Sequence, residues 1–182
     1  MRAHVGHIIR NYGGFEDDPL EQYVALAAGA GALVEFDGVA VLNEKARTLL
    51  PARVFRHAEL GDDRLEILRN FPLTVFFCGF VKYQVEDVPG VWMRSYGAWA
   101  LGCNDLAVLA EGHHEGEKYS EMFSDILKYQ LDSGAEFAGG HTMQVGASTY
   151  IRFREPIEEE YFLHDPDKAL VLELIAESEI NC

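Results

Sequence analysis

The sequence contains few cysteines, no long apolar run and no apolar segment at its start. Three cysteines, an odd number at wide spacing, do not form a disulfide framework, and free thiols suit a reducing compartment. No stretch approaches the roughly 18 consecutive apolar residues of a membrane helix. Residues 1–9 lack the apolar region of a signal peptide. We therefore expect a cytoplasmic protein.

Basic residues are also scarce. Fifteen Lys and Arg stand against thirty Asp and Glu, which gives a formal charge of -15. Such a charge repels phosphate backbones and anionic lipid head groups, so we expect neither a nucleic-acid nor a membrane partner. It attracts a basic protein partner, but an acidic surface also simply keeps a protein soluble. Both interpretations stay open at this point.

The common catalytic and cofactor motifs are absent as well. The chain has no glycine-rich nucleotide fingerprint, and no HExxH or CxxC spacing that would predict a metal site. The run Arg94-Ser95-Tyr96-Gly97 lacks the first glycine of a nucleophile elbow. Cys103 lies close to Asp105, and a carboxylate raises the pKa of a thiol. We therefore assign no catalytic residue, no cofactor and no metal.

The apolar residues that are present, 48% of the chain, suffice for one ordinary core, so we expect a single domain over residues 1–182. Strands and helices are mixed along the chain, and neighbouring strands are joined by short turns. This pattern predicts an α+β fold, with a mostly antiparallel or mixed sheet and helices packed on one side. One helix is expected from Pro19, after a cap at Asp18, to Gly29 and Gly31, and another over 44–50, after a cap at Asn43. Further helices are expected from Asp62 or Asp63 to before Pro72 and over 117–132, where an apolar stripe ends before a left-handed cap at Gly134. Strands are expected over 3–10, 33–42 (two pieces), 73–83, 91–99, 105–109, 142–145 and 148–153, while 170–175 is a strand or a short helix.

A histidine and acid cluster precedes the helix expected over 117–132. Glu111, His113 and His114 could hold a cation in a loop, and they are equally typical of a solvated polar loop. Acids at this place also complement the positive end of the helix dipole. The loop is therefore a candidate binding site with a sufficient structural explanation.

A second cluster follows the strand expected over 91–99. Gly97 and Gly102 permit a backbone turn between two strands, and Asp105 can accept hydrogen bonds from the amides of that turn. An exposed Trp99 would indicate a binding surface. With the loop, this cluster completes the candidate binding residues, which are Ser95, Tyr96, Gly97, Trp99, Asp105, Glu111, His113, His114 and His141.

The second cluster also carries a family resemblance. Ser95-Tyr96-Gly97, then Gly102, then Asp105-Leu106 resembles the pattern of a bacterial family, the domain-of-unknown-function family number 4261. The apolar segment that begins at Pro72, the helix over 117–132 and the hairpin after it also fit, so the resemblance covers mainly the second half of the chain. It implies a fold shared with cytoplasmic bacterial proteins and implies no activity.

Three functional hypotheses follow. The first is a non-enzymatic binding or regulatory module, in one form a protein that neutralises a basic protein partner. The second is an enzyme that brings His113, His114 or His141 together with Asp105 or Glu111 in one pocket. The third is a homo-oligomeric structural protein that uses exposed aromatic residues as its interface; the sequence leaves the oligomeric state open.

Overall fold

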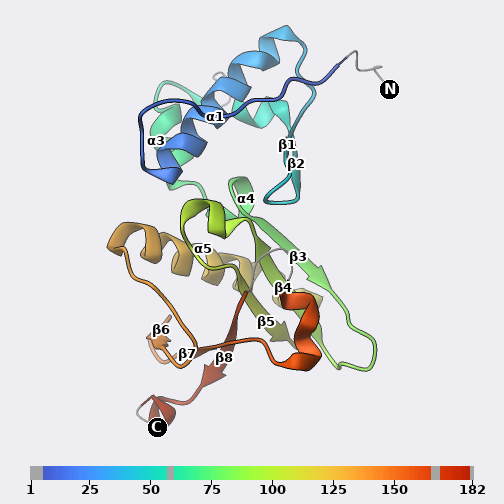
Figure 1. Cartoon of the computed structure of the whole chain (residues 1–182), viewed down its shortest axis with the longest axis vertical. Helices are drawn as coiled ribbons and strands as arrows, with labels where there is room; N and C mark the ends of the chain where they lie inside the picture. The colour runs from blue at the N-terminus through green and yellow to red at the C-terminus, as the bar shows by residue number, and fades with distance from the viewer. Residues whose placement is uncertain (1–5, 57–59, 165–168, 181–182) are drawn as a thin grey trace. The chain divides into compact units, whose positions relative to one another are not determined.

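The computed structural model describes residues 6–56, 60–164 and 169–180, and the chain divides into two compact units (Figure 1). The first unit is Met1–Phe71 and the second is Pro72–Cys182. The expectation of one domain over the whole chain stays a prediction. Within the described residues, no helix is both long enough and apolar enough to cross a membrane.

In its described residues, the first unit combines the α-helices α1 (Pro19–Leu33) and α3 (Arg64–Asn70) with a β-hairpin. Its other described elements are η1 (Val34–Phe36), β1 (Ala40–Asn43), β2 (Thr48–Pro51) and η2 (Ala52–Phe55). The start of α1 is as predicted, because the Asp18 carboxylate accepts hydrogen bonds from the backbone N–H groups of Leu20 and Glu21. The expected strand over 3–10 is wrong for Gly6–Arg10, which form no strand; residues 3–5 lie outside the described residues.

The predicted end of α1 is wrong, since the helix continues past Gly29 and Gly31 to Leu33. A Cβ atom on Gly31 would lie only 1.9 Å from the carbonyl oxygen of Phe55. This glycine therefore lets the helix backbone approach η2 closely and does not terminate the helix.

The helix expected over 44–50 is also wrong. Its residues form the turn of the hairpin and all of β2 but its last residue, and β1 and β2 pair antiparallel with Leu42 opposite Leu49. Asn43 caps this turn, because its Oδ1 accepts a hydrogen bond from the N–H of Ala46 at 3.3 Å. The residues after this cap do not continue as a helix, because Arg47 has a φ of 54°, in the left-handed region, where the chain turns into β2.

The second unit is built on a six-stranded sheet in the order β3-β4-β5-β8-β7-β6. Its strands are β3 (Gly79–Tyr83), β4 (Val91–Tyr96), β5 (Leu106–Ala110), β6 (Thr142–Gln144), β7 (Tyr150–Arg154) and β8 (Leu170–Ile175). The β5–β8 pair is parallel and the other pairs are antiparallel. This mixed sheet confirms the predicted α+β class. The expected strand over 73–83 is half wrong, because its first residues form a helical turn, α4 (Leu73–Phe76).

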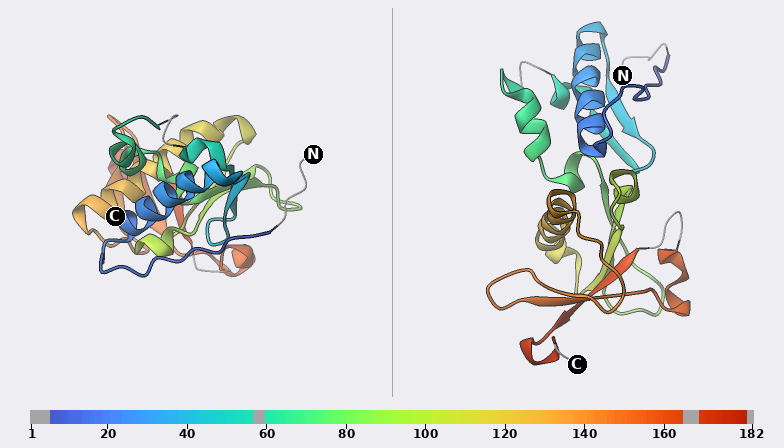
Figure 2. Two further views of the ribbon diagram at one scale, coloured as in Figure 1. Left: turned by 90° about the horizontal axis from the view of Figure 1, so that it is seen from above. Right: turned by 60° about the vertical axis from the view of Figure 1, so that its left-hand side comes forward.

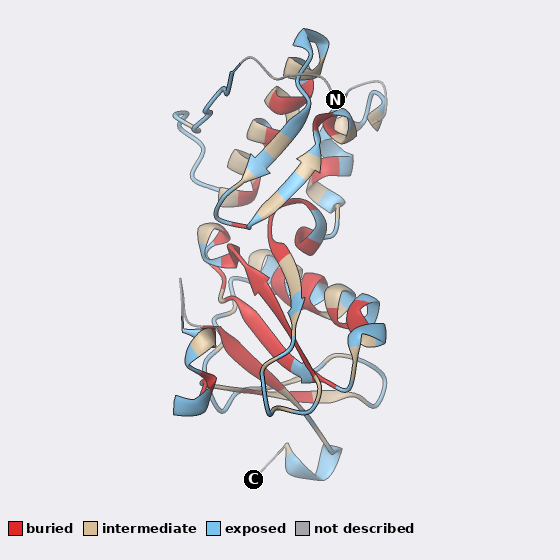
Figure 3. Cartoon of the chain, turned by 90° about the vertical axis from the view of Figure 1, so that its right-hand side faces the viewer, coloured by how far each residue is buried: buried red, intermediate tan, exposed pale blue. Residues whose placement is uncertain are grey.

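Both faces of the sheet are covered. Helix α5 (Gly116–Ser133) lies on one face, where Phe123 contacts Phe80 of β3, and α4 is hydrogen-bonded to α5 through Thr74 and Ser124. The 3-10 helix η5 (Glu158–Leu163) lies on the other face (Figure 2), where Phe162 contacts Trp92. All six residues of β4 are therefore buried (Figure 3).

Candidate functional site

The turn after β4 is organised around a buried carboxylate. Asp105 accepts hydrogen bonds from Ser95 Oγ at 3.1 Å, from the Ala98 N–H at 3.0 Å and from the Gly97 N–H at 3.3 Å. Ser95 Oγ in turn accepts from the Leu106 N–H at 2.8 Å. These bonds confirm the prediction that Asp105 binds the amides of the turn.

The glycines of this turn are required by its backbone. Gly97 and Gly102 have φ angles of 86° and 79°, and they enclose the 3-10 helix η3 (Ala98–Leu101). The expected strand over 91–99 therefore ends at Tyr96. Trp99 of η3 is partly exposed, at 41%, so one of the candidate residues faces solvent here.

The surroundings of Asp105 favour a structural role for this carboxylate and do not favour a nucleophilic thiolate at Cys103. Burial raises the pKa of Asp105, against the lowering effect of its hydrogen bonds and of Arg94. Burial first, and the nearby Asp105 second, raise the pKa of Cys103 to about 11. The predicted direction for this thiol is confirmed, although burial and not the carboxylate is its larger cause. Burial first, and Asp105 second, also raise the pKa of Cys78.

Arg94 is a buried charge that the sequence interpretation missed. Its side chain is fully buried, donates from Nη1 to the Phe162 carbonyl at 3.0 Å and lies 4.4 Å from the centre of the Tyr96 ring. It therefore ties η5 to β4, and Tyr96 serves as its aromatic platform. In the sequence, the one indication that Arg94 is buried is its position between the aromatic residues Trp92 and Tyr96 of the same strand.

The histidine and acid loop lies between β5 and α5. His113 and His114 are exposed in the 3-10 helix η4 (His113–Glu115). The Glu115 carboxylate accepts from the Glu111 N–H at 2.8 Å and from Lys118 at 3.0 Å, and the bond from Lys118 is the largest cause of its lowered pKa. In the part of the chain that the structure describes, no three His, Cys, Asp or Glu side chains gather as a metal would require.

His141 is separated from both clusters. It precedes β6 at one edge of the sheet, and β7 and β8 lie between β6 and β5. Asp105 is 1% exposed and fully engaged in its turn. His141, at the sheet edge, and Asp105, in its buried turn, are therefore not brought together in one site.

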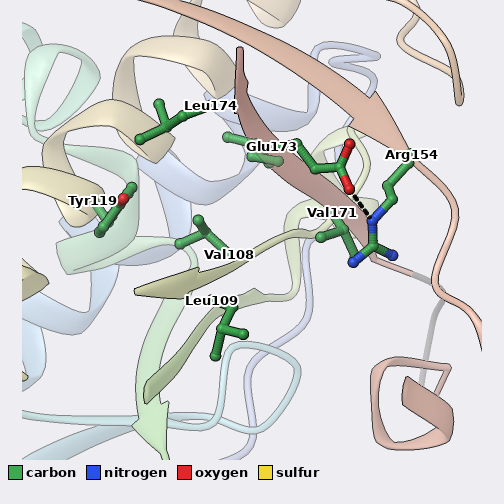
Figure 4. Close-up of a pocket in the computed structure, with 8 residues that line it drawn as sticks. Val108, Leu109, Tyr119, Arg154, Val171, Glu173 and Leu174 are labelled. Atoms are coloured by element: carbon green, nitrogen blue, oxygen red, sulfur yellow. Dashed lines mark hydrogen bonds and ion pairs between the residues drawn. The ribbon is translucent and has the colours of Figure 1, made fainter. Parts of the chain in front are cut away.

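The structure instead has an opening within the sheet, between β5 and β8 (Figure 4). The registered pairs of these parallel strands end at Ala107 with Val171, whereas β5 stays paired with β4 to Ala110 and β8 with β7 to Ile175. The two strands separate beyond this point and leave a cavity of about 270 Å³. Its lining is Val108, Leu109, Tyr119, Arg154, Val171, Leu172, Glu173 and Leu174.

An ion-pair network borders this opening. Arg154 donates from Nη1 and Nη2 to both carboxylate oxygens of Glu160, at 2.6 and 2.7 Å, and from Nε to Oε1 of Glu173 at 2.7 Å. Burial raises the pKa of Glu160, but the bonds from Arg154 and from the Ile157 N–H outweigh it and leave that pKa lowered. The network anchors η5 to β7 and β8.

A comparison with protein families bears on these same residues. Residues 94–173 match the family described as Domain of unknown function (DUF4261). The match confirms the resemblance carried by Ser95-Tyr96-Gly97, Gly102 and Asp105-Leu106, while the segment that begins at Pro72 lies outside it. No curated protein and no solved structure matches the chain.

The DUF4261 segment, residues 94–173, contains an acidic ridge on α5. We use this name for Glu117, Glu121 and Asp125, three exposed residues at i, i+4 and i+8 on the helix. No described residue forms an ion pair with any of the three, whereas Lys118 and Lys128 pair with Glu115 and Asp132. Neighbouring like charges at this spacing destabilise a helix. The repulsion within the ridge therefore lowers the stability of the helix, although Glu117 itself lies in the first turn, where the helix dipole favours an acid.

Glu121→Gln should stabilise the protein by about 0.5 kcal/mol, because it removes the two like-charge pairs at the centre of the ridge. Urea unfolding followed by tryptophan fluorescence at low salt measures this difference. The gain should shrink at high salt, since salt screens exposed charges. Glu136→Gln, in the exposed segment after α5, is the control and should be neutral. A destabilised Glu121→Gln protein would show that the repulsion is absent.

Proposed function

We propose that this protein is a non-catalytic cytoplasmic binding module that recognises a basic protein partner through its second unit. The observation that carries the proposal is the acidic ridge, whose like charges face solvent and have no counter-charge among the residues that the structure describes. A basic partner would supply that counter-charge. Its binding would relieve the repulsion between the like charges of the ridge.

The distribution of charge supports the proposal. From Pro72 onward the sequence has nineteen Asp and Glu against seven Lys and Arg, a formal charge of -12, whereas residues 1–71 have eleven against eight, or -3. An acid excess that served solubility alone would have no reason to gather in one unit. A field of one sign also steers an oppositely charged partner and speeds its association.

Most basic side chains of the second unit that the structure describes are engaged within the unit itself. Lys118, Lys128 and Arg154 are paired with carboxylates, and Arg94 is buried. Lys82 donates to the His113 carbonyl. The acids outside these pairs therefore dominate what a partner meets.

A cytoplasmic location is supported by the thiols. Cys78 and Cys103 are both free and buried. Buried free thiols persist where the surroundings are reducing.

The proposal is tested by affinity capture from the source cells with the full chain as bait. Wild type should retain one basic protein in near-stoichiometric amount. The variant Glu117→Gln, Glu121→Gln, Asp125→Asn should lose it by about tenfold or more, because three charges leave the contact surface. The matched control is Asp17→Asn, Glu44→Gln, Asp62→Asn, which removes the same charge from exposed positions of the first unit.

Retention by the control and loss by the ridge variant support a specific acidic site. Equal loss in both variants would mean that only net charge matters. Recovery of no specific basic protein by wild type would contradict the proposal itself.

A further inference from the structure

The opening between β5 and β8 presents two strand edges toward each other. Beyond Ala107 and Val171, each strand is paired on its outer side only, by β4 or by β7. Backbone N–H and C=O groups on such edges form a ready template for another extended segment. A segment entering between them would meet an edge on each side.

The side chains around the opening differ between the two faces of the sheet. On the α5 face the lining is apolar or aromatic, from Val108, Leu174 and Tyr119. On the η5 face it includes Glu173, whose ion pair with Arg154 is drawn in Figure 4. Because successive residues of a strand point to opposite faces, an inserted segment would place alternate side chains against these two surfaces.

On the η5 face, one carboxylate oxygen of Glu173 is open to a cation. Arg154 lies there bonded to the carboxylates of Glu160 and Glu173, and Arg152 donates to the backbone carbonyl of Glu179. Glu173 is the cross-strand partner of Arg152, and its Oε1 accepts from Arg154, while its Oε2 accepts no hydrogen bond from any residue that the structure describes. Its side chain is 43% exposed, so a ligand can reach that oxygen.

We propose that this opening binds an extended segment of the basic partner in which apolar and basic residues alternate. The segment pairs through its backbone with β5 and β8, places its apolar side chains on the α5 face and sets a lysine or arginine at Glu173. This inference rests on the proposed function, since it names the part of the partner that is recognised.

The test uses the full chain labelled with nitrogen-15 and short peptides with blocked ends. The first peptide alternates valine and lysine. The second has the same composition in a non-alternating order, and the third alternates but carries N-methyl groups that prevent backbone pairing. Affinity is measured from amide chemical shifts. The alternating peptide should bind about tenfold more tightly than either of the others, because only it satisfies both the pairing and the two faces.

Site-specific variants locate the contact. Glu173→Gln should weaken binding of the alternating peptide about tenfold, because a charge-assisted hydrogen bond is lost. Glu177→Gln, which removes an equal charge just after β8, should change it by less than about twofold. Leu109→Ser is a second variant, which changes the exposed apolar rim of the opening and leaves the charge unchanged. Its control is Ile157→Ser, which makes the same kind of change at an exposed apolar residue outside the lining.

The expected result is shift changes centred on Leu109 and on Val171–Leu174, with the stated order of peptides and variants. Equal affinity for the first two peptides, or equal losses in Glu173→Gln and Glu177→Gln, would overturn the inference and leave the ridge as the site of the proposed function. No binding of any lysine peptide, together with no basic partner in the capture experiment, would overturn both.

Discussion

Asp105→Ala should destabilise the second unit by about 3–5 kcal/mol, since three buried donors lose their acceptor at once. These donors are the Ser95 hydroxyl and the N–H groups of Gly97 and Ala98. A loss of this size is a large part of the total stability of an ordinary domain. Urea unfolding followed by tryptophan fluorescence measures it, because both tryptophans, Trp92 and Trp99, lie in this unit.

Asp105→Asn is the matched comparison and should lose only about 1–2 kcal/mol. Its oxygen can still accept from Ser95 and Ala98, but its amide nitrogen would face the Gly97 N–H, so one donor loses its acceptor. Equal losses for alanine and asparagine would show that the hydrogen bonds to the turn do not carry the effect.

The same pair of proteins yields a pH dependence. Because the pKa of Asp105 is raised in the folded protein, the folded state holds this proton more tightly than the unfolded state. Its contribution to stability is fully present below the ordinary value of 3.8 and falls as pH rises through the folded pKa. The stability gap between wild type and Asp105→Asn should therefore be widest in acid and narrower at neutral pH. A gap that widens with rising pH would contradict the raised pKa.

Glu160→Gln should destabilise the second unit by about 2 kcal/mol at neutral pH, because it weakens a largely buried bidentate ion pair with Arg154. The pKa of Glu160 is lowered on folding, so its contribution is present above the ordinary value of 4.5 and is lost as pH falls through the folded pKa. The difference between wild type and variant should thus disappear in acid, the opposite of the trend for Asp105.

The control for this prediction is Asp132→Asn, which breaks the exposed Lys128–Asp132 pair on α5. Exposed pairs at this helical spacing contribute about 0.3–0.5 kcal/mol. Stability curves of the three proteins from pH 3 to 7 separate the cases. A Glu160→Gln loss no larger than that of Asp132→Asn would mean that the network does not anchor η5.

Where local signals agreed with the final environment, the sequence was sufficient. The cap at Asp18, the apolar stripe of α5 and its left-handed end at Gly134 each depend on residues within a few positions, and the structure has all three. The hydrogen bonds of Asp105 were predictable for the same reason, since the turn it caps lies within ten residues of it.

Where tertiary packing requires a conformation other than the one that the local sequence favours, the prediction was wrong. Gly31 looks like a helix terminator, but the approach of Phe55 requires a residue without a side chain inside the helix. Asn43 looks like a helix cap, yet the following residues complete a hairpin in which Leu42 and Leu49 face each other.

The sequence by itself determined the α+β class, the acidic charge, the turn at Asp105 and the lack of a catalytic motif, because each of these follows from composition or from residues close along the chain. Only the tertiary structure decided that β8 inserts beside β5 in parallel, that the two strands separate after Val171, and that Arg154 meets both Glu160 and Glu173. Strand order joins segments more than sixty residues apart, and no periodicity or propensity within either segment encodes which neighbour it takes.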